Sequence, residues 1–148
     1  MVHTGAVHHL SFSVQDYELS KKFYQNLLVD LLGYIKIMEQ PYCTMWTHPP
    51  SGTSFCISPG TNVPHHKSNP GIHHLALAVE TRSEIDELYK KIVQFQSSIQ
   101  PQGAYGAILD APADYPQYAP GYYAVFFTDP DGIKLELAHT PGVHAPPS

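Results

Sequence analysis

The sequence predicts an α+β fold built from two pseudo-symmetric βαβββ modules, and three observations support this prediction. Residues 7–14 (Val-His-His-Leu-Ser-Phe-Ser-Val) recur at residues 72–79 as Ile-His-His-Leu-Ala-Leu-Ala-Val, an offset of 65 residues (72 minus 7). Both copies alternate between large apolar side chains and small or polar ones, which is the period of a half-buried strand. An amphipathic helical pattern follows each copy, so the two halves of the chain share one plan.

The first module spans about residues 5–58. After its opening strand, Asp16 is the expected N-cap of a helix that Gly33 is expected to end. The apolar positions of this helix recur at spacings of three and four, namely Leu19, Phe23, Leu27 and Leu28. Turn residues then separate three expected strands, at residues 34–38, 42–47 and 53–58.

A polar linker rich in proline and glycine, residues 59–71, leads to the second module at about residues 72–139. Thr81 and Glu84 form a capping-box pattern before the second helix. Strands are expected at residues 122–128 and 133–138, around the turn Asp129-Pro130-Asp131-Gly132, and residues 140–148 form a proline-rich tail. The whole chain is thus expected to be a single domain.

An insertion distinguishes the second module. If Cys56 corresponds to Glu136, the offset between the modules grows from 65 to 80 residues, so 15 extra residues lie between the helix and the closing strand. We expect residues 101–121 to form a long aromatic loop, which is either a rim of the binding site or an irregular crossover. The candidate substrate contacts are Tyr105, Tyr115, Tyr118 and Phe126.

Composition excludes several classes of function. The formal net charge is −5 and no basic run occurs, which argues against nucleic-acid binding. No apolar run approaches the roughly 20 residues that span a membrane, and the first residues lack the pattern of a signal peptide. Cys43 and Cys56 are too few to predict a disulfide framework. We therefore expect a soluble, cytoplasmic protein without a disulfide.

Strand alternation places His9 and His74 on the strand faces opposite the helices, and Glu136 on the same face of the closing strand. Two imidazoles and one carboxylate are typical ligands of Fe(II), Mn(II), Zn(II), Ni(II) or Co(II), with coordination positions left open. Small neighbours such as Ser11 and Ala76 leave room beside such an ion. The alternative is that the histidines are structural. The adjacent His8 and His73 are expected to point to the opposite faces.

Four motifs carry a resemblance to a known family: His9-Leu10-x-x-x-Val14, His74-Leu75-x-Leu77-x-Val79, Phe23-Tyr24-x-x-Leu27 to Leu32-Gly33-Tyr34, and Phe127-x-Asp129-Pro130-Asp131-Gly132-x-Lys134-x-Glu136. With these motifs the chain resembles the vicinal oxygen chelate superfamily, the group of glyoxalases, bleomycin-resistance proteins and ring-cleaving dioxygenases. The resemblance implies paired modules that form a cupped mixed sheet around one divalent metal ion, a small-molecule substrate and often a homodimer. It also carries His9, His74 and Glu136 over as metal ligands.

Departures from the subfamily patterns narrow the reaction. In glyoxalase I a Glu or Gln is a fourth ligand where this chain has Cys56, which we expect to be a small buried hydrophobe. Extradiol dioxygenases have a Tyr where Phe126 stands, and a preceding His that is absent here. Fosfomycin-resistance thiol transferases have a Thr at the place of Ser11, but Arg82 alone cannot build their cationic pocket.

The sequence therefore predicts a metal-dependent enzyme acting on a small oxygenated molecule, with glyoxalase-like lyase or isomerase chemistry favoured. Candidate catalytic side chains are Ser11, Tyr122 and Lys134. Two alternatives stay open: an Fe(II) extradiol-type dioxygenase or thiol transferase using the same three ligands, and a non-catalytic resistance protein that sequesters a small molecule.

Overall fold

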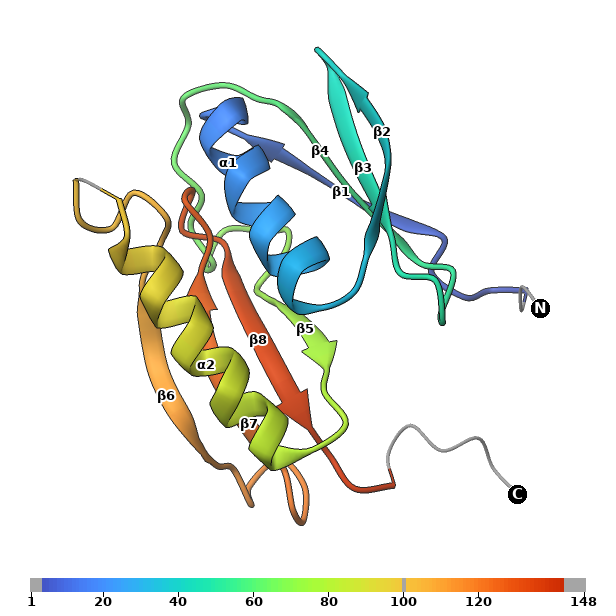
Figure 1. Cartoon of the computed structure of the whole chain (residues 1–148), viewed down its shortest axis with the longest axis vertical. Coiled ribbons are helices and arrows are strands. Elements are labelled where there is room, and N and C mark those ends of the chain that lie inside the picture. Colours follow the sequence, from blue (N-terminus) through green and yellow to red (C-terminus); the bar gives the residue numbers. More distant parts are fainter. Residues whose placement is uncertain (1–3, 100, 143–148) are drawn as a thin grey trace. The chain divides into compact units, whose positions relative to one another are not determined.

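Two four-stranded mixed sheets, each with helical structure on one face, make up the part of the chain that the computed structural model describes, residues 4–99 and 101–142 (Figure 1). The chain divides into two units, residues 1–64 and 65–148, and the boundary falls inside the predicted linker. Each unit runs β-α-β-β-β, so the predicted α+β class with paired βαβββ modules is confirmed. None of the helices in this described part is long and apolar enough to cross a membrane.

The first unit contains the four strands that the alternation predicts. They are β1 (His9–Val14), β2 (Ile35–Gln40), β3 (Cys43–Thr47) and β4 (Ser54–Pro59). Their order in the sheet is β1-β4-β3-β2, with β1 parallel to β4 and the other neighbours antiparallel. The opening strand therefore lies at one edge of its sheet, beside the closing strand of the same module.

The helix of the first unit begins and ends where the sequence predicts. Helix α1 (Tyr17–Tyr24) follows the N-cap Asp16, whose Oδ1 accepts the Leu19 N–H at 2.9 Å. The chain continues as a π-helical segment, η1 (Gln25–Leu31), which the sequence did not predict. Gly33 then adopts φ +73°, and the Tyr34 N–H donates to the Leu28 carbonyl at 2.8 Å, which closes the helix.

One face of the first sheet packs against this helix and carries the core of the unit. Phe12, Val14, Trp46, Phe55 and Ile57 are buried. The Trp46 Nε1–H donates to Gln25 Oε1 at 3.0 Å, which ties β3 to the helical segment. Strand alternation places His9, Ser11 and Ser13 on the other face, and all three are exposed.

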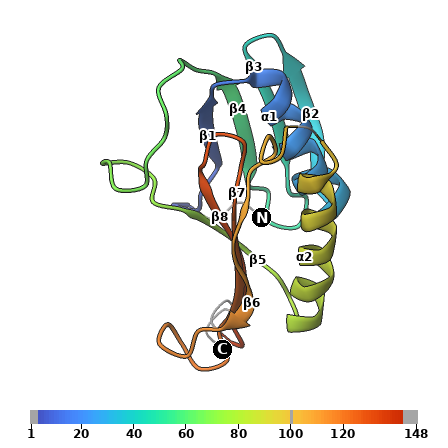
Figure 2. The same cartoon turned by 90° about the vertical axis from the view of Figure 1, so that its left-hand side faces the viewer.

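The second unit has the same plan. Its strands are β5 (Leu75–Ala78), β6 (Ile108–Asp114), β7 (Tyr123–Thr128) and β8 (Lys134–His139), in the order β5-β8-β7-β6 with β5 parallel to β8. Helix α2 (Arg82–Ser97) starts after Thr81, whose Oγ1 accepts the Glu84 N–H at 3.1 Å. Figure 2 shows α2 along one side of this sheet, where it buries Ile85, Leu88 and Ile92.

Strand β6 corrects the expectation that residues 101–121 are all loop. Residues 108–114 pair with β7 and complete the βαβββ plan of the second unit. The sequence Ile-Leu-Asp-Ala-Pro-Ala-Asp hides this strand because it contains Pro112 and lacks clean alternation. Both features are compatible with an edge strand, and the pairing with β7 contains two register shifts.

A disulfide between Cys43 and Cys56 corrects the expectation of two isolated cysteines. Antiparallel pairing sets Met45 opposite Cys56, so Cys43, two residues earlier on β3, lies diagonally across on the same face. The two Cα atoms are 6.6 Å apart. Disulfides are rare in cytoplasmic proteins, so the cytoplasmic location stays a prediction.

Candidate functional site

The parallel pairing of β5 with β8 brings His74 and Glu136 together. Ala76 lies opposite Glu136, and His74, two residues before Ala76, shares the same face of the sheet. The His74 Nε2 atom is 3.2 Å from Glu136 Oε2. The Glu136 side chain is only 2% exposed, whereas that of His74 is 37% exposed. A buried carboxylate thus meets the accessible edge of an imidazole, as the sequence predicts for two residues of one site.

Tyr122 occupies the other oxygen of the same carboxylate. Its hydroxyl donates to Glu136 Oε1 at 2.5 Å. Burial, and then the hydrogen bond to Glu136, raise the pKa of Tyr122 well above its ordinary value. The phenol is therefore protonated at neutral pH, and it orients the carboxylate as a hydrogen-bond donor.

His73 was expected to face away from the site, and this expectation is wrong. Its Nδ1 atom is 2.8 Å from the Nδ1 atom of His74, with the two rings edge to face. His73 lies two residues before β5, which begins at Leu75, so strand alternation does not fix the direction of its side chain. Burial, followed by the nearby charges of His74, Lys134 and Lys67, lowers the pKa of His73.

The pair His74–Glu136 fits two positions in the coordination shell of a divalent metal ion. Two ligand atoms at about 2.1 Å from one ion, with an angle between about 90° and 109°, are about 3.0 to 3.4 Å apart. The observed 3.2 Å lies inside this range. Over the described residues of either unit, no three His, Cys, Asp or Glu side chains gather into a metal-binding group. The second unit therefore brings together two of the three ligands that the sequence predicts.

A hollow of about 360 Å³ lies on the same face of the second sheet. Four alanines line it together with Tyr118 and Tyr122, namely Ala76, Ala78, Ala119 and Ala138. Tyr118 is 61% exposed and meets the Tyr122 ring edge to face, with the ring centroids 5.4 Å apart. The small side chains leave room beside Glu136, and the tyrosines provide an aromatic border.

The predicted aromatic contacts divide into two groups. Tyr115 stacks on Tyr118 with centroids 5.5 Å apart, and it meets Phe126 edge to face at 5.2 Å. Tyr105 is not part of this cluster: it is 4% exposed and stacks on Phe95 of α2, with centroids 4.4 Å apart. Its prediction as a substrate contact is therefore wrong, because its ring fills the core beside the helix.

The remaining candidates lie on the expected strand faces. Lys134 shares the face of Glu136, and its Nζ lies 4.1 Å from the centre of the Phe126 ring, a cation–π contact. Ser11 lies on β1 of the first unit, on the face of His9 and opposite Cys56. His8 and His9 repeat the contact of the other pair, with their Nδ1 atoms 3.0 Å apart.

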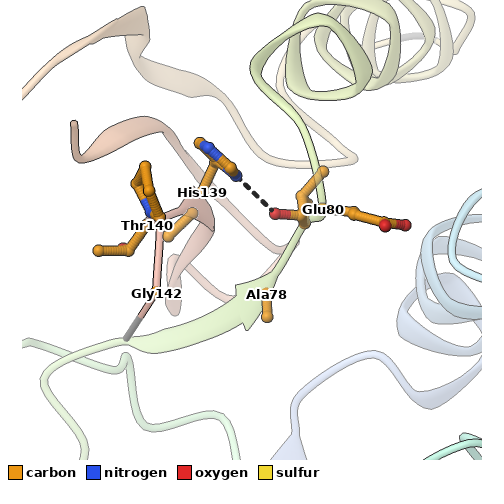
Figure 3. A pocket seen from close by; sticks show the side chains of 8 residues that line it. Ala78, Glu80, His139, Thr140 and Gly142 are labelled. Atoms are coloured by element: carbon orange, nitrogen blue, oxygen red, sulfur yellow. Dashed lines mark hydrogen bonds between the residues drawn. The ribbon is translucent and has the colours of Figure 1, made fainter. Parts of the chain in front are cut away.

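A second hollow, of about 410 Å³, lies where β5 and β8 end (Figure 3). Ala78, Glu80, His139, Thr140 and Gly142 are among the residues that line it. The His139 Nδ1 atom is 3.3 Å from the Val79 carbonyl oxygen. Because a carbonyl only accepts, this nitrogen carries a hydrogen. The contact joins the two strand ends.

Comparisons with known proteins find the same fold and identify a family. A family model described as Glyoxalase/Bleomycin resistance protein/Dioxygenase superfamily matches residues 6–137. A solved structure of a candidate glyoxalase from Bacillus halodurans has a TM-score of 0.72 and 25% identity, covering 93% of this chain and 97% of that one. Lactoylglutathione lyase from Agrobacterium tumefaciens has a TM-score of 0.65 and 15% identity, covering 95% and 98%. The uncharacterized protein YqjT of Bacillus subtilis is 26% identical over 138 residues, 88% of this chain and 96% of YqjT.

Proposed function

Since the chain belongs to the glyoxalase/bleomycin resistance protein/dioxygenase superfamily, we propose that it is a metal-dependent enzyme that acts on a small oxygenated molecule. We favour lyase or isomerase chemistry of the glyoxalase type. The proposed metal is one divalent ion per site, from the series Fe, Mn, Zn, Ni and Co. The homodimer and the cytoplasmic location expected from the sequence belong to the same proposal.

One observation carries the proposal: a buried carboxylate with an imidazole on one oxygen and a phenol on the other. His74 Nε2 is 3.2 Å from Glu136 Oε2, and the Tyr122 hydroxyl is 2.5 Å from Oε1. A purely structural carboxylate would not require an accessible histidine at its edge. An outer hydrogen bond that holds a ligating carboxylate is, in contrast, a regular feature of metal sites.

The third proposed ligand is His9. Its support is the sequence repeat, because His9 opens β1 as His74 precedes β5, each followed by Leu and then a small residue. Two imidazoles and one carboxylate leave coordination positions open for water and substrate. Cys56, at the place of a fourth ligand, is held in the disulfide with Cys43.

A divalent ion bound there would supply Lewis acidity toward two adjacent oxygens of the substrate. The protein's own residues have separate roles in the proposal. Tyr122 keeps Glu136 oriented through its hydrogen bond. Lys134, on the same strand face, provides a cation for a developing oxyanion, and Ser11 is a further polar group beside His9. Tyr118 borders the substrate, whose place is the hollow of about 360 Å³. Tyr115 stacks on Tyr118, and the buried Phe126 meets Tyr115 edge to face, so these two rings hold the border in place.

Metal analysis of protein purified without chelators tests the proposal. We expect about one divalent ion per chain in the wild type and less than about one tenth of that in Glu136→Ala, since losing even an outer partner of a ligand costs 10- to 100-fold in affinity. Glu87→Ala is the matched control, because Glu87 is an exposed glutamate on α2 paired with Lys90. Equal metal content in wild type and Glu136→Ala would refute the site.

Activity assays then separate the reactions. The name of the Agrobacterium relative suggests a first substrate class, the hemithioacetals that form from 2-oxoaldehydes and thiols. Conversion of such a hemithioacetal to a 2-hydroxyacyl thioester by the metal-loaded protein supports the favoured reaction. Oxygen uptake on catechols after anaerobic reconstitution with Fe(II) would instead assign a dioxygenase.

A second candidate function is sequestration of a flat small molecule without turnover. The exposed Tyr118 ring and the alanine-lined hollow favour it, since aromatic walls bind planar ligands without catalysis. The two candidates differ in their need for metal. Sequestration predicts that His74→Ala leaves the affinity for such a ligand unchanged, whereas the metalloenzyme predicts loss of both metal and activity.

A further inference from the structure

The same histidine pair occurs at the start of the first strand in both units. In the second unit the Nδ1 atoms of His73 and His74 are 2.8 Å apart, and in the first unit those of His8 and His9 are 3.0 Å apart. Both pairs have edge-to-face rings, with interplanar angles of 78° and 83°. A contact that recurs in two separate units, at the residue before each proposed ligand, calls for a common explanation.

We propose that His73 is a positioning residue that sets the tautomer of His74 through the Nδ1–Nδ1 hydrogen bond, and that His8 does the same for His9. This inference rests on the proposed function, in which His74 and His9 are metal ligands. A neutral imidazole has one nitrogen that donates and one that accepts, so a partner at Nδ1 decides what Nε2 can do.

In the metal-free protein the hydrogen positions follow from the carboxylate. Glu136 is an acceptor when ionised, so a neutral His74 that faces it at 3.2 Å carries its hydrogen on Nε2. The Nδ1 atom of His74 is then an acceptor. His73 must therefore donate its own Nδ1–H across the 2.8 Å contact, which leaves the exposed Nε2 of His73 without a hydrogen.

As a metal ligand through Nε2, His74 needs the opposite arrangement. It releases the Nε2 hydrogen to solvent and takes the Nδ1 hydrogen of His73, while the exposed His73 Nε2 takes a proton from water. One proton leaves the pair and one enters it, so both rings stay neutral and the two tautomers exchange. His73 then accepts from His74 Nδ1–H, as the outer partner of a ligating histidine regularly does.

Nuclear magnetic resonance of the full chain labelled with ¹⁵N-histidine tests this exchange at pH 8, using Zn²⁺ as the diamagnetic probe. Long-range ¹H–¹⁵N spectra report which ring nitrogen carries the hydrogen. We expect Nε2–H on His74 and Nδ1–H on His73 without metal, and the reverse on both rings after one equivalent of Zn²⁺. His66→Phe is the control, since His66 is an exposed histidine whose Nδ1 accepts a backbone N–H from Ser68.

Substitutions at His73 separate positioning from simple packing. His73→Phe keeps a ring but removes the partner, and we expect a Zn²⁺ affinity about 10- to 100-fold weaker. His73→Asn restores a polar atom near the place of Nδ1, and we expect it to recover most of the affinity. Unequal metal affinity with equal thermal stability of the two variants supports a positioning role. Equal affinity in His73→Phe and the wild type would overturn it.

The metal-free spectra keep the inference separate from the proposed function. A wild type that binds no Zn²⁺ would refute the metal site. The spectra of the metal-free protein would still show which ring donates the hydrogen in the Nδ1–Nδ1 contact. A His73 with its hydrogen on Nε2, or a His74 Nδ1 resonance that His73→Phe leaves unchanged, would overturn the inference. The same measurement on His8→Phe tests the first unit, with His9 as the reporting ring.

Discussion

Residue 56 of the first unit and residue 136 of the second occupy equivalent places in two sheets, yet they carry different chemistry. Cys56 lies opposite Ser11 in the parallel pair β1–β4, and Glu136 lies opposite Ala76 in the parallel pair β5–β8. Ser11 and Ala76 each follow a proposed histidine ligand by two residues. The backbone register is therefore the same in both units.

The side chains around the two positions explain the difference. Across the neighbouring antiparallel strand, the place of Cys43 in the first unit is taken by Ala124 in the second. The first unit uses both positions for a disulfide that joins β3 and β4. In the second, Ala124 is fully buried beside Glu136, which contacts His74 and Tyr122 instead. The same backbone register therefore carries a disulfide in the first unit and a buried carboxylate with two polar partners in the second.

The largest expected effect concerns what the two units share. Trp46 pairs with Phe55, and Phe127 pairs with Leu135, so the two aromatic side chains are equivalent and both are fully buried. We expect Trp46→Ala and Phe127→Ala each to lower the free energy of unfolding by about 3–5 kcal/mol. Urea unfolding measures the loss, and hydrogen exchange shows which unit loses protection.

Exposed side chains provide the matched controls for this pair. Tyr42 in the first unit is 67% exposed and Leu109 in the second is 47% exposed. Their substitution by Ala should change the free energy of unfolding by no more than about 0.5 kcal/mol. A loss that small for Trp46→Ala would contradict the equivalence of the two cores.

Reduction of the disulfide should affect only the first unit. The crosslink closes a loop between cysteines 13 residues apart in sequence, and opening a loop of this size costs about 2–3 kcal/mol in the chain-entropy model. Urea unfolding with and without a phosphine reductant measures the change. The double variant Cys43→Ala/Cys56→Ala should be insensitive to the reductant. Equal stability of the oxidised and reduced wild type, or two reactive thiols before reduction, would contradict the crosslink.

The fold was predictable because its signals are local. The repeated alternation at residues 7–14 and 72–79, and the caps at Asp16 and Thr81, each act within a few residues. Strand β6 was missed because an edge strand tolerates Pro112 and poor alternation. The disulfide was missed because it depends on which residues of β3 and β4 lie across from each other, which no pattern along the chain specifies.

The candidate site was predictable only where its residues follow the alternation of a strand. Alternation places His74 and Glu136 on one face, and the structure brings their side chains together. The partner of His74, His73, was missed because alternation was extended two residues before the start of β5. Tyr105 was predicted on the wrong side because an aromatic residue in a loop carries no signal for the face that it packs against.

Placing the side chains of Ala124 and Glu136 at positions 43 and 56 of the first unit would test the comparison of residues 56 and 136 directly. The double variant Cys43→Ala/Cys56→Glu gives the first unit the alanine and glutamate of the second. If the proposed site is correct, the added carboxylate should tighten metal binding by about 10-fold, or about 1.4 kcal/mol. Competition with a chromogenic chelator measures the affinity, and Cys43→Ala/Cys56→Ala is the matched control without a ligand atom at residue 56. Equal affinity of the two variants would show that residue 56 does not reach the metal.

The smallest expected effect concerns an ion pair that ties each helix to the outer strand of its sheet. In the first unit Lys21 of α1 lies 2.9 Å from Glu39 of β2, and Glu39 also contacts Lys36. In the second unit Arg82 of α2 holds Asp114 of β6 through two hydrogen bonds of 2.7 and 2.8 Å. The hydrogen bonds from Lys36 and Lys21 lower the pKa of Glu39 from 4.5 to about 2, and the hydrogen bond from Arg82 lowers the pKa of Asp114 below 3.8.

A lowered carboxyl pKa stabilises the folded state above the unfolded pKa, and the benefit is lost as the pH falls through the folded pKa. Glu39→Gln should therefore lower the melting temperature slightly at pH 7, with the difference from wild type shrinking between pH 4.5 and about 2. Asp114→Asn should behave alike below pH 3.8. Because these groups are exposed, added salt should weaken both effects, the Lys21–Glu39 contact more than the two-point Arg82–Asp114 pair. A difference from wild type that grows on acidification would contradict the assigned pairs.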